Sequence, residues 1–331
     1  MTYGLIKRNF SLVFVPIAVI LAVLCYQALF LKPLYVTELL TFSTNVVEGT
    51  TNNKPININA VLYMSREAKF PIPTVVITPS SSGIEKEREI YYAIQLTKAG
   101  FAALVIDSFS ARNVANSLYD QSLLESWQVE NDAIAALRHL KKDARFSPKP
   151  IAIMGVSKGG TVAMDSASKI RRGWTNVTDV AFSAHIAISP DCTWTMRSDE
   201  TTGAPILFML AELDDQTPVQ PCLEKAQRLT EAGNPSIETK VYKGVHHAWE
   251  EIGLAPQHGL EIENYSNCRV WIEDDGHMVS AETGDLVPEQ DWHTWAKQNC
   301  MILGATCCGG TPQHKQQATR DIVAFLRKHG F

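Results

Sequence analysis

A serine between two glycines is the first feature of this sequence that could do chemistry. Ser157 is the centre of a G-x-S-x-G sequence at 155–159, which follows a buried apolar run and precedes a stretch of helical composition. A strand that turns sharply into a helix exposes such a hydroxyl group, and it needs glycines because neighbouring side chains would clash. The backbone N–H of Lys158 then points at the same place and is a candidate oxyanion donor. An ordinary glycine-rich turn is the alternative, and the flanking strand and helix argue against it.

A serine nucleophile needs a base, and the base needs an acid to orient it. In folds that use this turn, the chain order is serine, acid, histidine. One predicted strand after Ser157 leads into Asp214 and Asp215, and the next leads into His246 and His247. Taken singly, the aspartates could cap a helix and the histidines could lie in a solvated loop. Because both pairs occur in the required order, the sequence predicts a site for acyl transfer.

A second oxyanion donor is expected in the first loop between a strand and a helix. That loop spans 78–83, and the backbone N–H of Ser81 is our candidate. A polar loop without this role is the alternative interpretation.

The elements that must hold these residues alternate between strands and helices. Short apolar runs predict strands at 75–77, 102–106, 151–154, 180–188, 205–210 and 238–242. Composition and spacing predict helices at 85–99, 129–140, 223–231 and 316–328, and one after Ser157. The segments 41–47 and 56–64 predict an antiparallel hairpin before the sheet. This alternation predicts an α/β fold with a mostly parallel sheet, helices on both faces and an active site at the C-terminal ends of the strands.

Residues 250–312 do not follow the alternation. They are rich in Gly, Asp, Glu and Trp and lack helical periodicity, and an Asp-Gly turn between 268–272 and 277–280 predicts a hairpin. We interpret them as an insertion within one domain that spans 32–331.

These motifs resemble the dienelactone hydrolase family of α/β-hydrolases. The resemblance runs from about Val75 to the C-terminus and rests on the loop after Ile77 and on the segments 107–112, 155–159, 212–218 and 244–249. It implies the α/β-hydrolase fold and hydrolysis of a small ester or lactone by Ser157, with no cofactor and no metal. It also implies that His247, not His246, is the base and that Asp214, not Asp215, is the acid.

The sequence departs from the family pattern in two places. The namesake enzymes use a cysteine nucleophile where this chain has Ser157, which favours a general serine esterase over the namesake substrate. The first loop has Pro79-Ser80 where many hydrolases have His-Gly. Arg112 and Trp249 are candidate substrate-binding residues, and a surface salt bridge is the alternative role for Arg112.

Six of the seven cysteines follow residue 190. In the setting that the resemblance implies, a Cys192–Cys222 disulfide would brace the acid-bearing loop and a Cys268–Cys300 disulfide would staple the insertion. Buried free thiols are the alternative, and the sequence alone leaves the pairing open. No C-x-x-C pair is present, which argues against a structural zinc site.

The N-terminal segment predicts attachment to a membrane. Residues 10–31 carry no charge and, as a helix, would span roughly 33 Å, about one bilayer core. Lys7 and Arg8 precede them, which favours a cytoplasmic segment at 1–9 and an exported body. A cleaved signal peptide followed by secretion is the close alternative, and a buried core helix is a third.

Composition and motifs limit the partners and functions that remain possible. The net charge of −5 gives no electrostatic footprint for nucleic acid, so we expect no nucleic-acid partner. A triad does not fix the scissile bond, so a serine peptidase or acyltransferase on the same fold is one alternative. A catalytically silent, membrane-tethered binding protein is another, and the presence of serine, acid and histidine argues against it.

Overall fold

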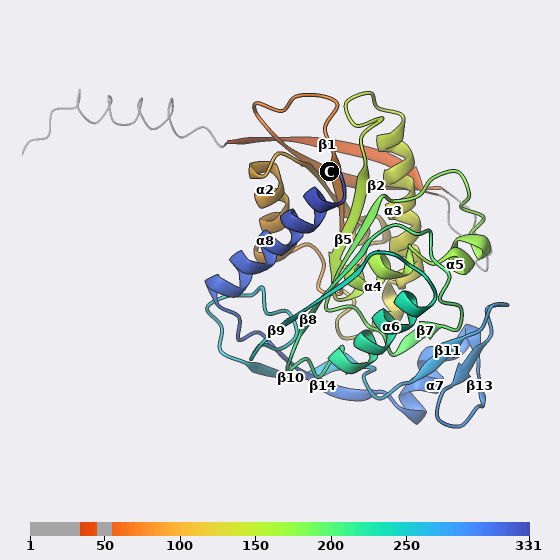
Figure 1. Cartoon of the computed structure of the whole chain (residues 1–331). Coiled ribbons are helices and arrows are strands. Elements are labelled where there is room, and N and C mark those ends of the chain that lie inside the picture. Colours follow the sequence, from red (N-terminus) through yellow and green to blue (C-terminus); the bar gives the residue numbers. More distant parts are fainter. Residues whose placement is uncertain (1–33, 45–54) are drawn as a thin grey trace, which may run out of the picture. The chain divides into compact units, whose positions relative to one another are not determined.

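An eight-stranded sheet is the centre of the computed structural model, which describes residues 34–44 and 55–331 (Figure 1). Its strands are β1 (Tyr35–Thr44), β2 (Ile56–Ser65), β3 (Thr74–Thr78), β4 (Ala102–Asp107), β5 (Ile151–Val156), β6 (Ala184–Ile188), β8 (Ile206–Ala211) and β9 (Ile237–Tyr242). They lie in the order β1-β2-β4-β3-β5-β6-β8-β9. β2 pairs antiparallel with β1 and β4, and the strands from β4 to β9 are parallel. The predicted mostly parallel sheet is therefore confirmed.

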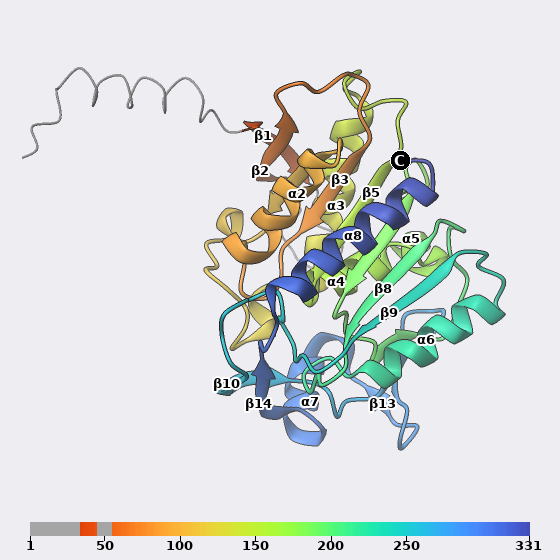
Figure 2. The same ribbon diagram turned by 60° about the vertical axis from the view of Figure 1, so that its left-hand side comes forward.

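Helices cover both faces of this sheet, as Figures 1 and 2 show. They are α2 (Tyr91–Lys98), α3 (Ser126–Lys141), α4 (Lys158–Asp165), α5 (Lys169–Trp174), α6 (Val219–Glu231) and α8 (Pro312–Lys328), and the short turns are η1 (Lys86–Ile90), η2 (Ser110–Arg112) and η3 (Gln121–Leu123). Successive side chains of a strand point to opposite faces. Val75 and Ile77 accordingly pack in the core under α2 and α8, whereas Val76 packs in the core under α3. This two-sided burial explains why the central strands are continuous apolar runs.

The predicted elements differ from the structure mainly at their ends. The first strand of the hairpin begins at Tyr35 and not at 41, because Tyr35 to Leu40 pair with the second half of β2. The predicted strand at 180–188 begins only at Ala184. The last helix begins four residues before 316, because Pro312 is its first residue and Thr311 caps its N-terminus by accepting a bond from the backbone N–H of His314.

Residues 250–312 contain two small sheets and a helix. The elements are β10 (Gln257–Asn264), β11 (Val270–Ile272), β12 (Met278–Ser280), β13 (Leu286–Val287), η4 (Glu289–Asp291), α7 (Trp292–Asn299) and β14 (Ile302–Cys307). β11 and β12 form the predicted hairpin, and β11 also pairs in parallel with β7 (Trp194–Met196). The sequence indicated neither α7 nor the antiparallel β10–β14 pair. Figures 1 and 2 show these elements grouped at one end of the central sheet.

Disulfides link three pairs of cysteines. Cys192–Cys222 and Cys268–Cys300 are the two predicted pairs, and the third joins the neighbours Cys307 and Cys308.

The predicted membrane segment at 10–31 and the segment 1–9 lie outside the described residues. In the ranges 34–44 and 55–331, no helix has both the length and the hydropathy to cross a bilayer.

Candidate active site

Ser157 lies on a strained turn between β5 and α4. Its backbone has φ 56° and ψ −122°, a conformation that costs energy for a residue with a side chain. Two glycines make the turn sterically possible. A Cβ atom at Gly155 would lie 2.3 Å from Thr78 Oγ1, and one at Gly159 would lie 2.5 Å from the Thr78 carbonyl oxygen. The glycines that the motif indicated are therefore required by close packing against β3.

The structure brings Ser157, His247 and Asp214 together at the C-terminal edge of the sheet. His247 Nε2 lies 2.9 Å from Ser157 Oγ, and His247 Nδ1 lies 2.8 Å from Asp214 Oδ2. The three side chains follow β5, β9 and β8, so they come from three strands that share one edge. The His247 and Asp214 side chains are buried. Burial lowers the pKa of His247, but the charge and the hydrogen bond of Asp214 raise it by more, and the net shift is upward.

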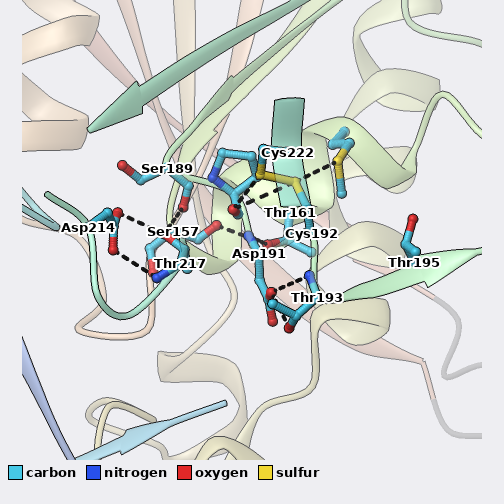
Figure 3. The surroundings of a disulfide bond; sticks show 12 residues. Ser157, Thr161, Ser189, Asp191, Cys192, Thr193, Thr195, Asp214, Thr217 and Cys222 are labelled. Atoms are coloured by element: carbon cyan, nitrogen blue, oxygen red, sulfur yellow. Dashed lines mark hydrogen bonds between the residues drawn. A yellow bond between two sulfur atoms is a disulfide. The ribbon is translucent and has the colours of Figure 1, made fainter. Parts of the chain in front are cut away.

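Thr217 contacts both Asp214 and His247, and our sequence analysis did not identify it as a site residue. Its hydroxyl lies 2.8 Å from Asp214 Oδ2, and its backbone N–H donates to Asp214 Oδ1 at 2.7 Å (Figure 3). The same hydroxyl lies 3.1 Å from His247 Nδ1. The backbone N–H of Gln216 donates to the same oxygen at 3.0 Å. These bonds fix the orientation of the carboxylate. The signal that could have identified Thr217 is its place three residues after the acid, where a hydroxyl side chain can return to the carboxylate.

The neighbouring acid and the neighbouring histidine have other partners. Asp215 is exposed and accepts bonds from the backbone N–H and the hydroxyl group of Thr306 on β14. The backbone N–H of His246 donates to the Cys308 carbonyl oxygen at 3.2 Å. The choice between the members of each pair, which the motif alone left open, is thus made by the geometry in favour of Asp214 and His247.

The two residues predicted to donate to the oxyanion line the same cavity as Ser157. Lys158 is the first residue of α4, where a backbone N–H has no partner within the helix. Ser81 is buried and lines the same cavity as Ser157 and Lys158. The Lys158 side chain is also buried, and its Nζ donates to Ser117 Oγ at 2.8 Å and to the Leu124 carbonyl oxygen. Burial lowers the pKa of Lys158 to about 8.

A cavity of about 250 Å³ opens at Ser157. Its apolar lining consists of Trp127, Trp194, Tyr265, Ile272, Met278 and Trp292. Tyr265, Ile272, Met278 and Trp292 belong to residues 250–312, so the segment that breaks the α/β alternation forms a wall of the cavity. The sequence did not indicate this wall, because its members are far apart along the chain and share no periodicity.

Two predicted substrate-binding residues lie outside the cavity, and we correct that prediction. Arg112 forms a two-pronged ion pair with the buried Asp132, at 2.8 and 3.0 Å, which occupies its guanidinium group. Trp249 has no exposed surface, and its ring stacks on Tyr242 at a centroid distance of 4.5 Å. Trp249 is thus a core residue under the histidine loop.

Two disulfides border the site. Cys192 lies three residues after Ser189, the residue that follows β6, and Cys222 lies in the first turn of α6. Their disulfide therefore joins the segment after β6 to the helix that follows Asp214 (Figure 3). The Cys307–Cys308 pair is next to the histidine loop, because the backbone N–H of Cys308 donates to the His247 carbonyl oxygen at 2.7 Å. Within the described parts of the chain, no cluster of three His, Cys, Asp or Glu side chains is placed to hold a metal ion.

Comparison with known proteins places this site in a family. The model of the dienelactone hydrolase family matches residues 58–273, a range that contains Ser157, Asp214 and His247. A probable 2-oxo-3-(5-oxofuran-2-ylidene)propanoate lactonase from Bradyrhizobium sp is 28% identical over 191 residues, which cover 54% of this chain and 74% of that protein.

Two of the solved structures that are similar to this chain are described as an esterase and a putative dienelactone hydrolase. An esterase of Pyrococcus furiosus has 13% identity and a TM-score of 0.48, with 64% of this chain and 85% of that chain covered. A putative dienelactone hydrolase of Klebsiella pneumoniae has 16% identity and a TM-score of 0.46, with 64% and 88% covered.

Proposed function

The chain belongs to the dienelactone hydrolase family, and from that premise we propose that it is a serine hydrolase that cleaves an ester, lactone or related acyl bond through an acyl-enzyme. One observation carries the proposal. The 2.9 Å approach of His247 Nε2 to Ser157 Oγ, with Asp214 on the other ring nitrogen, is the arrangement that lets an imidazole remove the hydroxyl proton.

In the proposed reaction, Ser157 Oγ attacks the carbonyl carbon as its proton moves to His247 Nε2. Asp214 accepts the hydrogen bond from Nδ1–H and stabilises the charged imidazolium. The backbone N–H groups of Lys158 and Ser81 bind the oxyanion of the tetrahedral intermediate. The imidazolium then protonates the leaving alcohol, and water, activated by the same histidine, hydrolyses the acyl-enzyme.

The relative from Bradyrhizobium is named as a lactonase, and a lactone is a cyclic ester that the same steps would open. A small-molecule lactone or ester is therefore the substrate class we propose. No step of this mechanism requires a metal or a cofactor.

We also propose that the catalytic unit is exported and attached to a membrane through residues 10–31, with secretion after cleavage as the alternative. The uncharged segment with Lys7 and Arg8 before it supports this location. The three disulfides also support it, because they are typical of oxidising compartments. The full chain should stay in the membrane pellet after alkaline carbonate extraction, whereas a chain without residues 10–31 should not; a full chain released by carbonate at its uncleaved mass would reject the anchor.

The catalytic proposal is tested by covalent labelling of Ser157. A fluorophosphonate probe should label the full chain, and Ser157→Ala should abolish both labelling and ester turnover. Ser43→Ala is the matched control, because Ser43 is exposed on β1, where its hydroxyl donates to Asn57 Oδ1 across the hairpin. Undiminished labelling and turnover in the Ser157 variant would reject the assignment.

A further inference from the structure

The cavity beside Ser157 has a continuous aromatic wall. The rings of Trp194 and Trp292 lie 4.6 Å apart, and those of Tyr265 and Trp292 lie 5.5 Å apart. Ile272 and Met278 extend this wall along the cavity lining. Such a surface binds a flat, apolar group by area burial and by ring contacts.

Three of the six charged side chains that line the cavity form ion pairs with residues outside the lining. Glu125 lies 2.7 Å from His293 Nε2, and Glu263 lies 2.8 Å from Lys297 Nζ. Arg171 is paired with Glu130. The charges of these three residues are therefore matched. Lys158 is the other cation of the lining, and its Nζ already donates to Ser117 Oγ and to the Leu124 carbonyl oxygen. This single cation faces two further lining carboxylates.

Two carboxylates of the lining, Asp165 and Asp191, have no such match. Across residues 34–44 and 55–331, no salt bridge joins either of them to a cation. Asp191 Oδ1 accepts bonds from the backbone N–H and the hydroxyl of Thr193, at 2.8 and 2.7 Å. A substrate carboxylate that entered the cavity would approach the two partly desolvated carboxylates of Asp165 and Asp191. The repulsion between like charges makes that approach unfavourable.

The pKa values of these acids agree with this environment. Burial raises the pKa of Asp165 to about 6, even though Arg171 counteracts the shift. Burial also raises the pKa of Asp191, and the bonds from Thr193 offset only part of that effect. Burial at the cavity therefore disfavours the ionised form of both acids.

We propose that the substrate of this site is an aromatic ester or lactone without a negative charge, whose ring lies against the wall formed by Trp194, Trp292 and Tyr265. The proposal rests on the proposed hydrolase function and names its substrate class. It separates this chain from its lactonase relative, whose named substrate is a propanoate and so carries a carboxylate. Arg112, a candidate substrate-binding residue in the sequence, is paired with Asp132 and lies outside the cavity.

Two matched sets of esters test this substrate class in the full chain, with acid release followed in a pH-stat at pH 8. Methyl 4-carbamoylphenylacetate and methyl 4-carboxyphenylacetate have nearly the same shape and differ in one charge, and methyl butyrate has no ring. We expect kcat/KM for the carbamoyl ester to exceed that for the carboxylate ester at least about tenfold, because like charges disfavour the second. Benzyl acetate and ethyl acetate test a ring on the alcohol side, and an aryl preference in either set supports the wall.

Three variants and one control connect these preferences to the residues. Asp165→Asn should raise kcat/KM for the carboxylate ester relative to the carbamoyl ester, and Met278→Ala should lower the preference for aryl over alkyl esters. Trp292→Leu should lower that preference further, with its melting curve showing whether it folds. Ser43→Ala should change neither ratio.

The outcomes separate this inference from the proposed function. If the carboxylate ester is hydrolysed as well as its carbamoyl partner, or if aryl and alkyl esters are hydrolysed equally in both sets, the substrate class is wrong while the hydrolase remains. If no ester is hydrolysed and the fluorophosphonate probe does not label Ser157, the proposed function itself fails.

Discussion

Asp215 accepts two hydrogen bonds from Thr306, one from the backbone N–H at 2.8 Å and one from the hydroxyl group at 2.7 Å. Its neighbour Asp214 instead accepts a hydrogen bond from His247 Nδ1. Two adjacent acids thus have different partners: Asp214 orients the imidazole, and Asp215 ties β14 to the acid loop. The connection places the end of the 250–312 segment against the catalytic loop.

Because the two aspartates have different partners, two conservative variants should lower kcat by very different amounts. Asp214→Asn should lower kcat by about 10³–10⁴-fold, because an amide no longer selects the tautomer that His247 needs. Asp215→Asn keeps an acceptor toward Thr306 at an exposed position, so it should lower kcat less than about tenfold and stability by about 1 kcal/mol. Steady-state kinetics and thermal melts of the two variants give the comparison. Equal losses of kcat would show that Asp214 is not the orienting acid.

Thr217 should matter through Asp214. Thr217→Val keeps the volume and both backbone N–H bonds to the carboxylate but removes the hydroxyl, 2.8 Å from Asp214 Oδ2. We expect kcat/KM to fall about tenfold, which corresponds to one charge-assisted hydrogen bond of about 1.4 kcal/mol. Thr217→Ser, which keeps the hydroxyl, is the control and should retain most of the activity. If serine and valine behave alike, the side chain acts through packing and not through its hydroxyl.

The pH dependence should report the environment of His247. The histidine must be neutral to act as a base, so kcat/KM should rise with pH and reach a plateau. Burial lowers the pKa of His247 and Asp214 raises it by more, so the midpoint should lie above the ordinary histidine value of 6.5. Asp214→Asn removes the raising effect and should move the residual midpoint below that of the wild type. An unchanged midpoint in this variant would mean that a group other than His247 determines the rise of kcat/KM with pH.

The sequence predicted the parts of this site that local rules determine. The strained turn at Ser157 needs glycines within two residues, so a short motif identifies it. The parallel strands are buried on both faces and therefore appear as apolar runs, which located Asp214 and His247 at strand ends. The disulfide pairs at Cys192 and Cys268 came from the family resemblance and not from spacing.

What the sequence did not predict depends on contacts between distant segments. β7 has three residues and pairs with β11, more than seventy positions later. Trp292 lines the cavity only because α7 folds against Trp194, and no local pattern encodes that contact. Trp249 was placed in the site because it follows the histidine, but the turn at Ala248, with φ 52°, directs the chain so that Trp249 packs in the core.

The raised pKa of Asp165 predicts how stability depends on pH. Its folded pKa of about 6 lies above its ordinary value of 3.8, so the folded state binds this proton more tightly than the unfolded state does. The stabilisation is complete below pH 3.8 and is lost as the pH rises through 6. Asp165→Asn should therefore gain stability relative to the wild type between pH 4 and pH 8. Denaturant unfolding at both pH values measures the change, and a difference that stays constant with pH would contradict the assignment.

The Cys192–Cys222 disulfide should stabilise the whole catalytic unit. Its loop has a sequence separation of 30, for which chain entropy predicts a contribution of about 3–4 kcal/mol. Removing both cysteines in Cys192→Ala/Cys222→Ala avoids a free thiol and should lower the free energy of unfolding by that amount, with kcat at 25 °C nearly kept.

Cys268→Ala/Cys300→Ala is the matched variant, because its separation of 32 predicts a similar entropy. This pair lies in the segment that forms the aromatic wall, where Cys268 packs with Tyr265 and near Trp292. Its removal should therefore also loosen the cavity, raising KM for aryl esters and exposing residues 250–312 to limited proteolysis. Melting curves, steady-state kinetics and protease mapping of the two double variants distinguish the effects. If both variants change only the melting temperature, the insertion disulfide does not support the cavity wall.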